Sequence, residues 1–251
     1  MSKLFFLLSF LIVFLLLTRC ERVGDCYIQP GQVIKVERET KNLDFVNSIE
    51  LKGNVSLFLT KGEENSIYLQ SGENLIDGII CETEDSLLRI YDEVFCNWLS
   101  GYKHEMKVFL TLDELKQITY SGSAGLYTTD TFNIGNTGKL EIIIGDASGV
   151  VNMKIKGGHL ELKHYFGVID LKMSGQVNTC TVHHVARGRI DLFHLKTSGL
   201  KIKSASVNDA RVYALERLQV QISGSGNVYY RGNPHIELTR SGSGNLMKND
   251  D

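Results

Sequence analysis

The chain has 251 residues, of which 43% are hydrophobic and 22% are charged, and its formal net charge is −2. This apolar content is enough to build a folded core, so a disordered chain is not expected. The near-neutral charge balance, without a run of lysine and arginine, argues against a nucleic-acid partner, which needs a basic face. The length suits one large domain or two small ones.

The N-terminus carries an export signal. Lys3 precedes Leu4–Leu17, an almost wholly apolar stretch interrupted by a single serine. The stretch is short for a membrane span of about 20 residues and is typical of the apolar core of a signal peptide. The tetrapeptide Leu17-Thr18-Arg19-Cys20 then resembles a bacterial lipobox, although Arg19 stands where a small residue is usual.

Two interpretations of this start remain. Either residues 1–20 are a signal peptide and Cys20 is lipidated, or an uncleaved anchor helix runs to about Val23. The first makes the protein an outer-membrane lipoprotein of the cell envelope, on the surface or the periplasmic face, with a lipid anchor in the membrane. Both predict export, and residues 21–48 are expected to form an N-terminal cap or linker.

Export places the remaining four cysteines where disulfides persist. Cys81 and Cys96 bracket a short segment, and we hypothesise that they pair across a local hairpin, although spacing alone does not fix the connectivity. No two cysteines have the CxxC spacing of a zinc or redox site. We expect no metal, no other cofactor and no catalytic residue.

Residues 49–251 are predicted to form a β-solenoid whose first part, residues 49–111, has irregular coils. Alternating apolar residues mark its strands, as in Ile49-Glu50-Leu51. An insertion at residues 92–105 interrupts the pattern and contains Phe95, Trp98 and Tyr102. This loop either contacts a partner or caps the core and buries Trp98.

The regular coils, residues 112–246, provide the main evidence for the fold. Six segments have apolar residues at their first and third positions, and their starts are separated by 20, 20, 20, 18 and 18 residues. Strict alternation predicts one buried and one solvated face. Stacking them yields one apolar column of Leu140, Leu160, Cys180, Leu200, Leu218 and Ile236, and a second of Ile142, Leu162, Val182, Ile202, Val220 and Leu238.

A second set of short strands alternates in the other half of each period, for example at Ile169/Leu171 and Ile190/Leu192. Glycine-rich corners separate the two sets, and Ser223–Gly226 and Ser241–Gly244 both read SGSG. Glycine is expected there because it adopts left-handed dihedrals and lets neighbouring coils approach. A unit this short buries its apolar face only by stacking. The sequence therefore predicts an all-β, single-stranded parallel β-helix, right-handed, with coils of 18–20 residues.

Two histidine patterns need to be weighed against metal binding. In Cys180-x-x-His183-His184, alternation turns Cys180 inward and His183 outward, so the two cannot share an ion. A third column aligns His164 with His184 on adjacent coils. The pair is either a weak metal or pH-sensitive site, or two structural side chains that hydrogen-bond near a corner.

The C-terminal part, Val220–Pro234 followed by Ser241–Leu246, resembles the head-GIN family of putative auto-transporter adhesins in its repeated SGSG corners and its Val-Tyr-Tyr-Arg-Gly-Asn-Pro element. Leu115–Gly125 and Phe45–Tyr91 are similar to other parts of that family. The corners at Phe166, Arg187 and Ser206–Asp209 depart from its SGSG form. The resemblance implies a bacterial β-helical envelope domain without assigned catalytic residues.

These observations favour an exported, envelope-anchored, non-enzymatic surface or adhesion module. Its expected partner is a host or cell-surface protein or a glycan, and self-association into a homo-oligomer is open. The alternatives are a structural envelope protein and a polysaccharide-active β-helix enzyme. The enzyme needs paired carboxylates on an outer face, and we expect no acid pair aligned on adjacent coils beside an aromatic platform.

Overall fold

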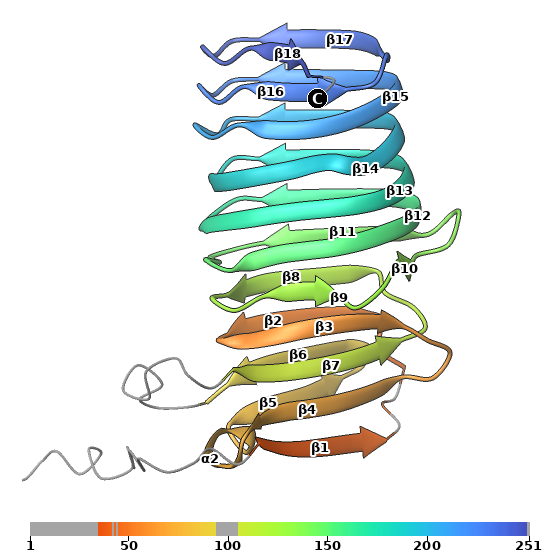
Figure 1. Cartoon of the computed structure of the whole chain (residues 1–251), viewed down its shortest axis with the longest axis vertical. Coiled ribbons are helices and arrows are strands. Elements are labelled where there is room, and N and C mark those ends of the chain that lie inside the picture. Colours follow the sequence, from red (N-terminus) through yellow and green to blue (C-terminus); the bar gives the residue numbers. More distant parts are fainter. Residues whose placement is uncertain (1–34, 42, 44, 94–104, 250–251) are drawn as a thin grey trace, which may run out of the picture.

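The computed structural model describes residues 35–41, 43, 45–93 and 105–249, and in these almost every element is a strand. The exception is one helical turn, α2 (Glu73–Ile76). The strands stack into a solenoid of about seven turns, shown in Figure 1, so the predicted all-β solenoid is confirmed. In the described part of the chain, no helix has the length and apolar character needed to cross a membrane.

The C-terminal half of the solenoid consists of regular coils whose neighbouring strands all run parallel. Long strands bend at the edge of the molecule and continue on its other face, so one strand serves both faces of a coil (Figure 1). The strands are β11 (Lys139–Ile144), β12 (Val150–His164), β13 (Val168–His184), β14 (Arg187–Ser204), β15 (Ala210–Ile222), β16 (Val228–Arg231), β17 (His235–Arg240) and β18 (Leu246–Lys248).

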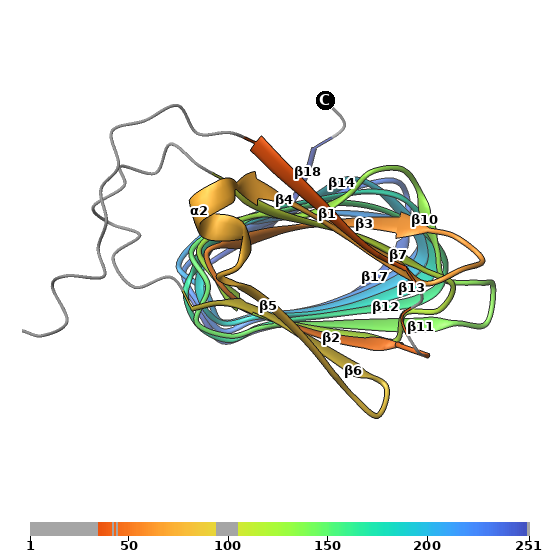
Figure 2. The same cartoon turned by 90° about the horizontal axis from the view of Figure 1, so that it is seen from below.

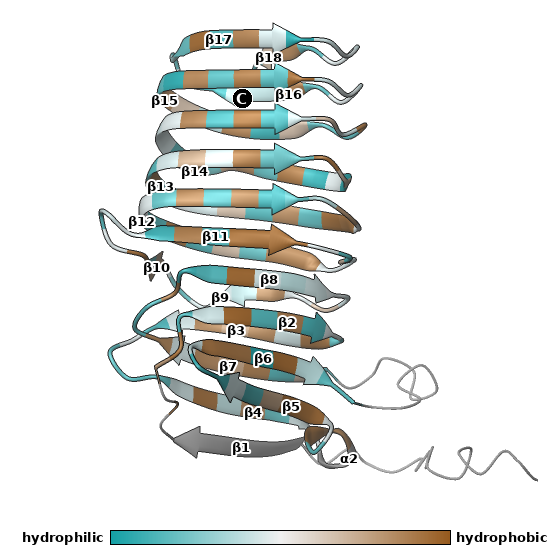
Figure 3. Cartoon of the chain, turned by 180° about the vertical axis from the view of Figure 1, so that it is seen from behind, coloured by the Kyte–Doolittle hydropathy of each residue, from teal (hydrophilic) through white to brown (hydrophobic). Residues whose placement is uncertain are grey.

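The register of these strands is the one that the sequence period predicts. Leu140 pairs with Leu160, which pairs with Cys180, and the same column continues to Ile236 through β14, β15 and β17. In Figure 1 the near strands run from left to right and the far strands return while the chain rises, so the coils are right-handed as expected. Figure 3 shows the alternation as brown and teal bands, clearest along strands such as β15.

The core fills the space between the two faces, which Figure 2 shows from the end. The column members from Leu140 to Leu218 and from Ile142 to Val220 are buried, and only the last coil exposes its members. Full burial of such side chains stabilises the fold by about 1.5–3 kcal/mol each. A short unit that is unstable alone thus becomes stable through its neighbours.

The N-terminal half differs from the regular coils in two ways that the sequence does not reveal. The strands there are β1 (Lys35–Lys41), β2 (Ser48–Gly53), β3 (Val55–Lys61), β4 (Ser66–Gly72), β5 (Ile79–Glu84), β6 (Leu87–Asp92), β7 (Met106–Leu112), β8 (Gln117–Gly122), β9 (Leu126–Thr128) and β10 (Phe132–Asn133). First, β2 and β3 lie between β6 and β7 on one side and β8 and β9 on the other. Second, β4 pairs antiparallel with both β1 and β7, and β5 pairs antiparallel with β6.

The glycines of the SGSG corners have a role that corrects part of the prediction. They lack the left-handed φ that is expected of glycine at a corner, whereas Gly167 (φ +87°) and Gly188 (φ +116°) have it. Close approach is what requires them. A Cβ on Gly224 would lie 2.1 Å from the carbonyl oxygen of Ser206, and one on Gly242 would lie 2.1 Å from that of Gly224. These corners are tight because coils touch through their backbones.

Candidate functional site

Several residues singled out in the sequence lie outside the described part of the chain. These are the lipidation candidate Cys20, the disulfide candidate Cys96 and the partner-contact candidates Phe95, Trp98 and Tyr102. Cys81 is described and lies half-buried on β5, opposite Ile90 of β6. Burial raises the pKa of its thiol to about 12, so a reduced Cys81 is a protonated, weakly reactive thiol.

Cys180 and His183 point to opposite faces of β13, as the alternation predicts. Cys180 is buried in the core, where burial raises the pKa of its thiol to about 12. His183 faces solvent and is half-buried. The two side chains therefore do not meet.

The third column brings His164 and His184 together, as predicted. Both rings are buried and stack with centroids 5.4 Å apart, and their Nδ1 atoms are 3.3 Å apart, so one Nδ1–H donates to the other ring. The pKa of each ring is lowered to about 4, mainly by burial, and for His184 also by the neighbouring His164. Both rings are thus neutral at physiological pH. Among the described residues, no group of three or more histidine, cysteine or acidic side chains could hold a metal ion.

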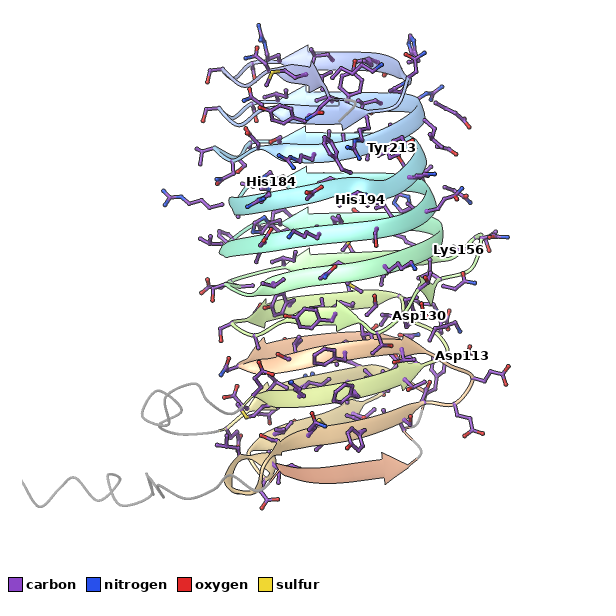
Figure 4. All side chains as sticks on the ribbon, viewed as in Figure 1. Asp113, Asp130, Lys156, His184, His194 and Tyr213 are labelled. Carbon is purple, nitrogen blue, oxygen red and sulfur yellow. The ribbon has the colours of Figure 1, made fainter. Side chains whose placement is uncertain are left out.

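The described surface contains an open groove with a cavity volume of about 860 Å³. Two chain excursions form its walls, residues 113–116 between β7 and β8 and residues 134–138 between β10 and β11. It lies on the edge of the solenoid where Figure 4 labels Asp113, opposite the edge near His184. The side chains and backbone that line it belong to Ser48, Lys61, Asp113, Glu114, Leu115, Lys116, Gln117, Asn133, Ile134, Gly135, Thr137, Gly138, Lys139 and Glu141.

The charges in this groove are neutralised by local partners. Lys61 Nζ lies 2.6 Å from Asp113 Oδ1, and Lys116 Nζ lies 3.1 Å from Glu114 Oε1. Lys139 Nζ lies 2.6 Å from Glu161 Oε2, just outside the lining. The groove therefore offers a ligand paired charges together with hydroxyl, amide and backbone groups. Such a surface suits a polar, uncharged ligand.

An acid pair aligned on adjacent coils is present, a pair that the sequence analysis does not single out. Glu141 of β11 pairs in register with Glu161 of β12, and Lys163 forms an ion pair with both, at 3.2 Å from Glu161 Oε1. Gln117 Nε2 donates to Glu141 Oε2 at 3.0 Å. The hydrogen bond from Lys163 lowers the pKa of Glu141, and that from Lys139 lowers the pKa of Glu161. Both carboxylates are held ionised, so neither is poised as a general acid.

A ladder of aromatic rings on the face formed by β3, β4, β7 and β9 was also not predicted. Phe58 of β3 stacks on Phe109 of β7 and on Tyr127 of β9, with ring centroids 4.9 Å apart in both pairs. Tyr68 of β4 contacts Phe109 edge-on at 5.6 Å. Because the rings cover one another's faces, they stabilise adjacent strands and do not form the exposed platform on which a sugar ring stacks.

Comparison with known proteins agrees with this architecture. Solved structures with the same fold include a putative adhesin from Bacteroides fragilis (TM-score 0.77, 21% identity, 88% of this chain and 99% of that chain). A putative lipid binding protein from Parabacteroides distasonis (0.57, 22%, 87% and 98%) and a putative adhesin from Parabacteroides merdae (0.57, 20%, 87% and 97%) are also similar. At these identities the likeness concerns the fold alone. No curated protein matches the chain.

A family model covers most of the chain. The model of the head-GIN domain of putative auto-transporter adhesins matches residues 45–234, which run from the coil of β2 and β3 through the first SGSG corner. The predicted resemblance is thus confirmed over more than half of the sequence. The chain belongs to the head-GIN domain family of putative auto-transporter adhesins.

Proposed function

We propose that the protein is an exported, envelope-anchored binding module of the adhesin type, and that the groove beside Asp113 binds a polar, uncharged chain such as a glycan. The groove carries the proposal, because its charges are already paired and its walls present hydroxyl, amide and backbone groups. Anchoring through a lipid on Cys20 belongs to the same proposal and is supported by the lipobox-like Leu17-Thr18-Arg19-Cys20.

Membership of the adhesin family supports a binding role. The ionised state of Glu141 and Glu161 supports binding over hydrolysis, because cleavage of a glycosidic bond needs a carboxyl that stays protonated near neutral pH. The aligned acids are nevertheless the feature on which a polysaccharide-active enzyme would depend, so the test includes a search for cleaved products.

The test is binding of the full chain to a panel of neutral and charged glycans, with a variant that fills the groove. Thr137→Trp places a large side chain on the wall at an exposed position and is expected to weaken binding by tenfold or more, a loss of about 1.4 kcal/mol. Thr239→Trp is the matched control, because Thr239 is exposed on β17, far along the solenoid.

Equal binding by wild type and Thr137→Trp would remove the groove from the proposal. Release of shorter glycans by the wild type, lost in Glu141→Gln, would replace the binding module with an enzyme. Labelling with radioactive palmitate in cells, absent from Cys20→Ser, tests the anchor separately.

A further inference from the structure

The corners opposite the groove expose an unusual group of apolar side chains. We call Tyr165, Phe166, Val168, Val185 and Val207 the apolar ridge. Phe166 is 69% and Val207 63% exposed, and the other three are exposed as well. They come from the three consecutive corners that follow β12, β13 and β14, at the right-hand edge of the solenoid in Figure 3. The three corners stack on one another through backbone hydrogen bonds.

The ridge is confined to the corners that depart from the SGSG form. The backbone N–H groups of Val185 and Ser223 each donate to the third-column residue of the coil before, so the corners occupy equivalent positions. The two corners beyond the ridge, Ser223–Gly226 and Ser241–Gly244, carry only serine and glycine. Neither corner form is required by the solenoid, because both occur on the same stack. The apolar residues therefore need an explanation other than coil geometry.

Basic side chains flank the ridge on both faces of the solenoid. Lys201 and Lys203 precede the third corner on β14, and Arg187 follows the second corner at the start of the same strand. All three are exposed, and within the described residues none of them forms an ion pair. Burial, and then the charge of Lys203, lowers the pKa of His183, which lies beside the ridge. The exposed carboxylates of Asp146 and Asp209 lie on the same stack of corners, and the three unpaired cations outnumber them, so the flanks of the ridge carry an excess of positive charge.

A convex apolar surface between cationic flanks matches the interface of an anionic lipid bilayer. Apolar side chains enter the boundary between headgroups and acyl chains, and lysine and arginine beside them attract anionic headgroups. Charge complementarity therefore favours a membrane over a protein as the occupant.

The position of the ridge on the molecule fits this occupant. Lys35, the first described residue, pairs with Gly72 next to α2. Figures 1 and 2 place α2 on the same edge of the solenoid as the ridge corners, so the described chain begins on the side of the ridge. A membrane in contact with the ridge leaves the groove on the opposite edge facing away from the lipid (Figure 4).

We infer that the apolar ridge and its basic flanks form a docking surface for an anionic lipid membrane, which holds the solenoid on its side with the groove turned outward. The inference rests on the ridge residues and needs neither a ligand in the groove nor a lipid on Cys20.

The experiment uses the full chain with its single tryptophan, Trp98, replaced by phenylalanine. Phe166→Trp then reports from the ridge, and Asn136→Trp reports from an exposed position on the groove edge. Vesicles with brominated acyl chains contain either phosphatidylcholine alone or about 30% phosphatidylglycerol. Both variants keep the same N-terminal segment, so any attachment through that segment is identical and is measured separately by vesicle flotation.

The tryptophan at position 166 is expected to shift to the blue and lose about half of its emission with anionic vesicles, but not with phosphatidylcholine alone. The tryptophan at position 136 should stay unquenched. Adding Lys201→Ser and Lys203→Ser should abolish the quenching at position 166. The inference is overturned if both positions are quenched alike, if neither is quenched, or if the blue shift at position 166 grows with protein concentration without vesicles, which would identify a second copy as the occupant.

Discussion

At the scale of single residues, the buried pair His164 and His184 makes stability depend on pH. Unfolded imidazoles titrate near pH 6.5, whereas burial lowers the pKa of both folded rings to about 4. The unfolded state therefore binds protons first as the pH falls. The stabilisation is complete above pH 6.5 and is lost between pH 6.5 and 4, by about 1 kcal/mol per ring for each pH unit.

Urea unfolding at pH 7, 6, 5 and 4.5 measures this effect, and the double variant His164→Leu/His184→Leu isolates it from the carboxylates. The same column accepts Ile144 and Ile222 in other coils, so leucine fits the position. The unfolding free energy of the variant minus that of the wild type should rise steadily as the pH falls below 6.5, because only the wild type loses stability through these two rings. A constant difference across this range would mean that the rings do not titrate as neutral buried groups.

At the scale of one element, the SGSG corner depends on backbone contact between coils. Gly224→Ala places a Cβ 2.1 Å from the carbonyl oxygen of Ser206 and 2.6 Å from the carbonyl carbon of Ala205, and neither atom belongs to a side chain that can rotate away. The coils must separate, so we expect a loss of about 1–3 kcal/mol in unfolding free energy. The midpoint of urea denaturation measures it.

Ser225→Ala is the matched control in the same corner, because Ser225 is exposed and its change to alanine adds no atom toward the coil before. Its denaturation midpoint should equal that of the wild type. If Gly224→Ala also unfolds at the wild-type midpoint, neighbouring coils can separate enough to admit a Cβ, and close approach is not the reason for glycine at this position.

At the scale of the whole molecule, the last coil of the solenoid places the charged side chain of Arg240 in a column that is apolar in the coil before. β17 and β18 pair with β15 and β16 on one side, and Leu238 is 48% exposed. Arg240 occupies the inward third column, where Ile222 precedes it, and its Nη1 donates to Asn245 Oδ1 at 2.5 Å. An inward-facing charge at an open edge opposes pairing with another chain.

Arg240→Ile is therefore expected to promote association of two chains through their C-terminal ends. Sedimentation velocity over a hundredfold concentration range should show a dimer for this variant. Thr239→Ile, with the same new side chain on the outward face of β17, should sediment like the wild type. A monomeric Arg240→Ile would show that the exposed edge is protected by something other than this charge.

The sequence predicts the regular coils because the period of apolar residues fixes both strand and register. The aligned acids Glu141 and Glu161 could have been found in the same way, since each lies between the two apolar residues of consecutive segments. The groove could not, because its walls are chain excursions outside the period. The position of β2 and β3 was equally inaccessible, since any coil with the same alternation offers an equivalent apolar face.

That position of β2 and β3 has a consequence for how the protein is made. Both neighbours of this coil are synthesised after it, and the last of them, β9, ends at Thr128. The stack around β2 and β3 therefore cannot be completed until β9 has left the ribosome. Shortening the chain from its C-terminus removes one outer coil at a time. A nascent chain that stops before β8, in contrast, leaves β2 and β3 each with one hydrogen-bonding edge unpaired.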